Sequence, residues 1–223
     1  FRKNRLLLNE FKIDTDIGNI AAEGWLTSNG NNDDLFKHND SLNIKMNFNS
    51  FDFQTLNRYL PWTSEVGGIF SGNTLIKGMA DNLDIKLDTK IESPFFDKIK
   101  GELISGNILY KKSNLYLSGI NLITKTGKYT VTGNIPINIS LINKSDININ
   151  NLPLDIMMTG KFKEFELLTP YLTKVDTLTG DFSMQLSING TYEKPNRNGQ
   201  LVIQNGKLNL LTLSNSIKNI NAV

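Results

Sequence analysis

The sequence predicts an all-β fold, built as an elongated, repetitive and amphipathic sheet with two short helices. Three observations predict this class. Apolar and polar residues alternate with a period of two along several segments. Residues that favour turns, mainly Gly and Asn, separate those segments. The order of segments then recurs after about 110 residues, which is typical of repeat architectures.

The clearest strand is predicted at residues 42–48, where Leu, Ile, Met and Phe occupy the even positions and Asn or Lys the odd ones. One face of such a strand lies in an apolar environment and the other in water. The same alternation predicts strands at 83–87, 135–141, 182–188 and around 208–210. Turns are predicted between strands where Gly and Asn tolerate positive φ, at Asn29-Gly30, Ser105-Gly106-Asn107, Asn189-Gly190 and Asn205-Gly206.

Two stretches depart from the strand pattern. Residues 53–60 and 165–172 each place apolar side chains at spacings of three, three and one, which fits a helix of two or three turns. Pro61 would end the first helix, whereas Pro170 lies inside the second, where proline is unfavourable. We expect both helices to pack against one end of the sheet as aromatic plugs.

The same two stretches belong to an internal repeat. Adding 112 to a residue number maps Leu42, Ile44 and Met46 onto Leu154, Ile156 and Met158, and maps the first helical stretch onto the second without a gap. An offset of 109 maps Gly18 and Gly24 onto Gly127 and Gly133. We therefore expect residues 1–223 to be part of one elongated domain, with copies at roughly 1–110 and 111–223 that are truncated at both ends.

Composition argues against several functions. The net charge is only +2 and no basic cluster is interleaved with aromatic residues, so nucleic-acid binding is not expected. The chain has no cysteine, no Gly-x-Ser-x-Gly elbow, no Gly-rich phosphate loop and a single histidine, His38, in a polar run. That run contains acidic residues, but it has no Glu at the position where a calcium-binding loop needs a bidentate ligand. We expect neither catalysis nor a metal or cofactor, and no segment is apolar enough to span a membrane as a helix.

Degenerate motifs in the second copy resemble the repeat of TamB-type proteins, in the AsmA-like group of the diderm bacterial envelope. They are residues 167–172 (Leu-Leu-Thr-Pro-Tyr-Leu), Leu178-Thr-Gly180, Ile188-Asn-Gly190-Thr, Lys194-Pro195, Gly199-Gln-Leu201 and Gly206-Lys-Leu208. Residues 127–136 and 217–222 also fit, so the resemblance covers nearly the whole chain. The first copy departs from the pattern, because Asp81-Asn82 lies in the region that matches Lys194-Pro195 and no Pro closely follows Gly78.

The resemblance implies a periplasmic segment of a protein that is anchored in the inner membrane by a helix outside residues 1–223. It implies a sheet rolled into an open trough with an apolar inside, whose partners are phospholipid acyl chains and an Omp85-type outer-membrane protein. The candidate groove residues are the apolar members of the alternating segments: Leu42, Ile44, Met46, Ile85, Leu87, Leu117, Leu122, Ile135, Ile137, Ile139, Ile156, Met158, Met184, Leu186 and Ile188.

Three hypotheses of different classes follow. The first is a lipid-conducting bridge between the inner and outer membranes, which requires one unbroken apolar face through both copies. The second is a scaffold for outer-membrane protein assembly or secretion, in which exposed sheet edges pair with client strands. The third is a closed β-sandwich that acts as a binding module, which requires two sealed sheets.

Overall fold

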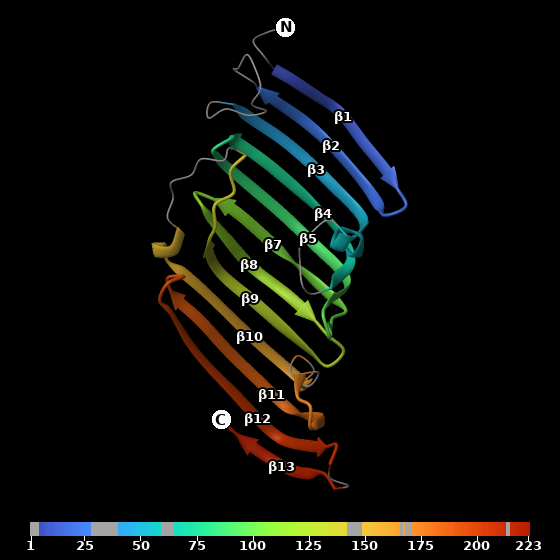
Figure 1. The fold of residues 1–223 in the computed structure, drawn as a ribbon, viewed down its shortest axis with the longest axis vertical. Helices are drawn as coiled ribbons and strands as arrows, with labels where there is room; N and C mark the ends of the chain where they lie inside the picture. The colour runs from blue at the N-terminus through green and yellow to red at the C-terminus, as the bar shows by residue number, and fades with distance from the viewer. Residues whose placement is uncertain are drawn as a thin grey trace.

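The computed structural model describes residues 5–27, 40–58, 65–141, 149–165, 167, 171–212 and 215–223. They form a single antiparallel sheet of 13 strands in the order β1-β2-β3-β4-β5-β7-β8-β9-β10-β11-β12-β13, with β6 paired to β5 (Figure 1). The strands are β1 (Arg5–Thr15), β2 (Gly18–Thr27), β3 (Ser41–Asp52), β4 (Val66–Met79), β5 (Asn82–Phe96), β6 (Ile99–Lys100), β7 (Leu103–Lys111), β8 (Asn114–Ile123), β9 (Gly127–Pro136), β10 (Leu154–Glu164), β11 (Val175–Gly190), β12 (Pro195–Leu210) and β13 (Ile217–Ala222).

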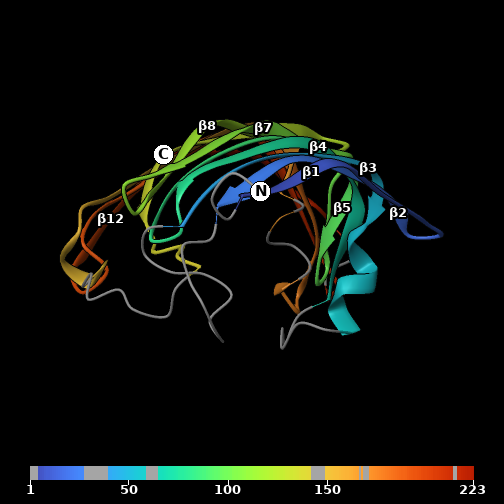
Figure 2. The same ribbon diagram turned by 90° about the horizontal axis from the view of Figure 1, so that it is seen from above.

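The sheet is elongated and open. Figure 1 shows successive strands side by side along the long axis, with β1 and β13 at opposite ends. Figure 2 shows that the sheet curves into an arch, and the 3-10 helix η1 (Phe53–Arg58) lies beneath it. We call the space on this concave side the trough. The predicted all-β, open fold is confirmed, and the closed-sandwich hypothesis is wrong because the described strands form one sheet rather than two.

Two of the predicted turns are wrong because they lie inside strands. Ser105-Gly106-Asn107 lies within β7 and Asn205-Gly206 within β12, each at a shift in the pairing register. Gly106 has a φ of 156° and Asn205 a φ of 54°. Positive φ serves a bulge here, which bends a long strand without ending it. The turn predicted at Asn189-Gly190 is displaced: both residues are the last of β11 and pair with β12, and the turn itself lies at 191–194. Asn29-Gly30 lies outside the described residues.

The first helix prediction is confirmed only as a short 3-10 helix. η1 is a 3-10 helix rather than an α-helix of two or three turns. Asp52 caps it, because its carboxylate accepts a hydrogen bond from the amide of Gln54 at 2.9 Å and its carbonyl accepts one from the hydroxyl of Thr55 at 2.7 Å. The second predicted helix, 165–172, falls partly outside the described residues, and those described there form no α-helix. A short 3-10 turn, η2 (Ile149–Asn151), was not predicted.

The strand predicted at 135–141 is wrong beyond its first two residues. β9 ends at Pro136, and residues 137–141 leave the sheet. They run along the ends of earlier strands: the amide of Ile137 donates to the carbonyl of Ser113 at 3.0 Å, and that of Leu141 donates to the carbonyl of Ala80 at 3.0 Å. We call residues 137–141 the strap. Alternation alone cannot reveal it, because its partners are distant in sequence.

Positions that are 109 or 112 residues apart occupy matching places in the sheet. Leu42 pairs with Gly78 between β3 and β4, and Leu154 pairs with Gly190 between β10 and β11. The hydroxyl of Thr15 donates to the carbonyl of Gly18 at 2.9 Å in one turn, and the equivalent bond from Thr124 to Gly127 is 3.3 Å in the other. The division of the domain into two truncated copies stays a prediction.

Candidate functional site: the concave apolar face

The pairing register defines a row of residues across the concave face. Residues directly opposite in neighbouring strands share a face of a sheet, and the interstrand spacing is about 4.8 Å. Successive partners from β1 to β12 are Phe11, Ala22, Met46, Thr74, Leu87, Ile108, Leu117, Gly133, Ile156, Ile188 and Arg197. We call this set the central row. At that spacing it extends roughly 50 Å.

The central row faces the trough. The helix η1 lies under the arch in Figure 2. The ring of its first residue, Phe53, contacts that of Phe70 at a centroid distance of 5.2 Å. Phe70 and Thr74 are four residues apart on β4, and side chains an even number of residues apart lie on the same face of a strand. The apolar row therefore lies on the concave side.

The structure brings nearly all the predicted groove residues to this face. By register, the candidates on β3, β5, β8, β9, β10 and β11 share the face of the central row. Leu42 is only 3% exposed, so its side chain contributes to the core rather than to an accessible groove. Ile137 and Ile139 are exceptions, because they lie in the strap and not on a strand. Whether these residues contact lipid stays a prediction.

The strap closes one side of the trough. Ile139 packs against a cluster of Leu42, Leu83 and Tyr110, in which each of the three is at most 3% exposed. The hydroxyl of Tyr110 accepts a hydrogen bond from the amide of Ile139 at 2.9 Å and lies 3.2 Å from its carbonyl, to which it donates. A single phenol therefore satisfies both backbone groups of the strap residue that enters the core.

Replacing Tyr110 by phenylalanine is expected to loosen the strap without unfolding the sheet. The ring keeps its apolar contacts, but both backbone groups of Ile139 lose their partner, at a cost of about 1–3 kcal/mol. Amide hydrogen exchange of Ile139 should accelerate at least about tenfold. Tyr116→Phe is the matched control, since Tyr116 is 39% exposed and pairs with Asn134 on the other face. Unchanged exchange at Ile139 in Tyr110→Phe would contradict this role.

Aromatic clusters close the opposite side of the trough. In the first, Phe70 contacts Phe48 at 5.3 Å and Phe53 at 5.2 Å. In the second, the ring of Phe162 stacks on those of Phe182 at 4.8 Å, Tyr129 at 5.1 Å and Phe165 at 5.3 Å. Phe53 and Phe165, which begin the two predicted helical stretches, thus both pack on sheet aromatics, as the plug interpretation requires.

An apolar cavity of about 270 Å³ lies beside the first cluster. Its lining combines η1, the start of β4, the β5, β6 and β7 segment and one residue of β8: Phe53, Val66, Gly67, Ile91, Pro94, Phe95, Phe96, Ile99, Gly101, Ile104 and Leu122. Phe96 is 53% exposed, so apolar surface continues from the cavity to the outside.

The convex face is mostly polar and carries the ion pairs. Glu23 and Lys45 pair at 3.4 Å, and Asp84 and Lys111 at 3.5 Å, both between neighbouring strands. The ammonium of Lys163 lowers the pKa of the Asp181 carboxyl by hydrogen bonding to it, with a further contribution from Asn205. These exposed pairs contribute little to stability.

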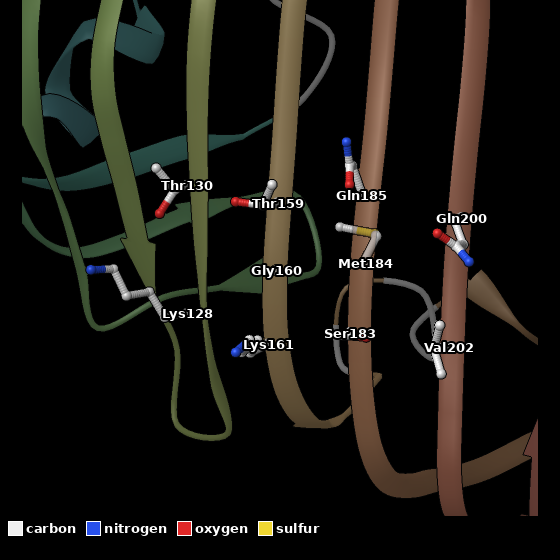
Figure 3. Close-up of a pocket in the computed structure, with 10 residues that line it drawn as sticks. All are labelled: Lys128, Thr130, Thr159, Gly160, Lys161, Ser183, Met184, Gln185, Gln200 and Val202. Atoms are coloured by element: carbon white, nitrogen blue, oxygen red, sulfur yellow. The ribbon is translucent and has the colours of Figure 1, made fainter. Parts of the chain in front are cut away.

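A shallow depression of about 520 Å³ crosses β9 to β12 (Figure 3). Most of the side chains that line it lie on the convex face, including Lys128, Thr130, Thr159 and Lys161. Of the lining residues, only Gly160 and Met184 lie on the concave face. Lys128 and Lys161 are direct cross-strand partners. The residues that line the depression include no carboxylate, thiol or imidazole.

Sequence reasoning missed Tyr110 and Arg197. Tyr110 could have been assigned to the concave face from the sequence, because it lies an even number of residues from Ile104 and Ile108 on the same strand. Arg197 stands at one of the alternating positions that Leu201 and Ile203 mark as apolar, and a charged residue at such a position indicates a special role.

Within the described ranges, no three His, Cys, Asp or Glu residues are grouped to hold a metal ion. No helix among the described residues is long and apolar enough to cross a membrane. No family model, curated protein or solved structure matches this chain.

Proposed function

We propose that this chain is a periplasmic segment of an inner-membrane-anchored envelope protein of the TamB, AsmA-like kind, and that its trough carries phospholipids between the inner and outer membranes. The observation that carries the proposal is the central row. It is apolar from β1 to β11 except at Thr74, and one open sheet presents it. At roughly 50 Å it is longer than the ~30 Å hydrocarbon core of one bilayer.

The energetics favour acyl chains as the occupant. Contact with apolar surface contributes about 0.8 kcal/mol for each buried CH₂ group, so partial burial of a tail offsets much of the cost of leaving a membrane. Strap and aromatic clusters cover the two sides of the concave face, whereas Leu186 remains 40% exposed. A contiguous apolar surface of this size is unusual for a soluble protein without a partner.

Two adjacent methionines provide the test. Met158 pairs with Leu186 on the concave face, whereas its neighbour Met157 pairs with Ser187 on the convex face and is 42% exposed. A photoreactive residue placed at either position, in cells that make the whole protein, is expected to yield phospholipid adducts at position 158. Few or none are expected at position 157, although it is exposed. Equal labelling at both positions, or none at position 158, would reject the lipid trough.

A second candidate function is favoured by the sheet edges. β1 and β13 each pair with one strand only within the described residues, and Leu6 and Leu7 of β1 are 66% and 60% exposed. Such an edge can add a client strand by β-augmentation. Adducts to outer-membrane proteins at position 7, together with no lipid adduct at position 158, would favour assembly with an Omp85-type partner instead.

A further inference from the structure

Arg197 ends the central row with a positive charge. It pairs directly with Ile188, which pairs with Ile156, so its side chain lies on the concave apolar face. It is the one charged residue in the row, and it is exposed. The ion pairs described above join residues of the convex face, and Arg197 takes part in none of them. An arginine at an apolar position needs a reason, because a Leu or Ile there would continue the row.

The neighbours of Arg197 form an apolar floor beside the guanidinium. Gly199, two residues along the same face, pairs with Leu186, and a Cβ at Gly199 would lie 2.6 Å from the Cδ2 atom of Leu186. The leucine therefore leans over the glycine, next to Arg197. Met158 pairs with Leu186 and extends the floor onto β10. A fixed cation thus adjoins exposed aliphatic surface, which complements a molecule with an anionic head and an apolar tail.

The first copy lacks this arrangement. The residue 112 positions before Arg197 is Ile85, and the one before Gly199 is Leu87. Ile85 packs with the cluster that the strap residue Ile139 covers. The matching place is therefore closed and apolar in the first copy, but open and charged in the second.

We propose that Arg197 binds the phosphate of an anionic phospholipid whose acyl chains lie on Met158, Leu186 and Ile188. This inference rests on the proposed lipid trough and adds a headgroup site to it. A guanidinium donates two parallel hydrogen bonds to a phosphate, which a lysine ammonium reproduces only as a point charge. Arg197 would therefore select phosphate-bearing lipids over lipids that lack a phosphate and hold each lipid at a defined place on the row.

The test compares two lipids that differ in the phosphate. The purified chain is mixed with vesicles of digalactosyldiacylglycerol, a bilayer-forming lipid without phosphate, that contain a photoreactive phosphatidylglycerol or a photoreactive diacylglycerol, and the adduct of each is quantified. The wild type should capture phosphatidylglycerol about tenfold better than diacylglycerol. Arg197→Gln should abolish that preference and leave diacylglycerol capture unchanged. Arg197→Lys should retain part of it.

Lys207→Gln is the matched control, because Lys207 is an exposed cation on the same strand that pairs with Thr179 on the convex face. It should keep the wild-type preference. If Arg197→Gln still prefers phosphatidylglycerol, or the wild type captures both lipids equally, the headgroup site is overturned while the trough stands. If the wild type captures neither lipid, the proposed function itself fails and the site with it.

Discussion

Gly133→Ala is expected to destabilise the protein by about 3 kcal/mol or more, because neither the backbone conformation nor the space allows a side chain. Gly133 has a φ of 138°, which costs an L-residue strain energy. A Cβ there would lie 2.1 Å from the carbonyl oxygen of Asp155 and 2.8 Å from the Cα of Ile156. These are backbone atoms of the neighbouring strand, so relieving the clash must disturb the pairing of β9 with β10.

Urea unfolding followed by circular dichroism measures this effect. Gly119→Ala is the control, because Gly119 has a φ of 69° but no atom lies within 4 Å of its Cβ position. It should cost only about 1–2 kcal/mol, the strain of a left-handed residue. Gly24 is expected to behave like Gly133, since its Cβ would also lie 2.1 Å from a carbonyl oxygen, that of Asn43. Equal losses in Gly119→Ala and Gly133→Ala would show that strain, not close approach, sets the cost.

The fold class could be predicted because one physical rule governs most of the chain. Successive side chains of a strand point to opposite faces, so the alternating positions of apolar residues such as Met46 and Met158 are enough to assign them to one face. The repeat added long-range information: Gly24 and Gly133, aligned by sequence alone, meet the same backbone environment in the structure. Neither inference needs knowledge of distant contacts.

The failures share a different cause. Gly106 and Asn205 tolerate positive φ, and both a turn and a bulge require it, so the sequence cannot separate the two. Ile137 and Ile139 alternate like a strand, but Ser113 and Tyr110, more than 20 residues earlier in the chain, hold them in the strap. The local sequence pattern cannot predict the structure of a segment when contacts with residues far away in the sequence determine it.

Phe182→Ala is expected to cost about 3–5 kcal/mol, the usual range for removing a buried phenylalanine ring. Phe182 is 4% exposed, and its ring stacks on that of Phe162 at 4.8 Å with an interplanar angle of 6°. Phe165 also contacts it at 5.7 Å, so its loss leaves a cavity at the aromatic side of the trough. Phe96→Ala is the control, since Phe96 is 53% exposed and should cost under about 1 kcal/mol.

Combining Phe182→Ala with Phe70→Ala tests whether the two aromatic clusters act independently. Phe70 is 7% exposed and occupies the corresponding position 112 residues earlier, where it contacts Phe48 and Phe53 rather than any ring of the second cluster. Changes at sites without shared partners add to within about 0.5 kcal/mol, so the double variant should lose the sum of the two single losses. A clear departure from additivity in guanidinium chloride unfolding would instead mean that the sheet couples the clusters. In that case a disturbance at one aromatic plug would reach the part of the trough that the other closes.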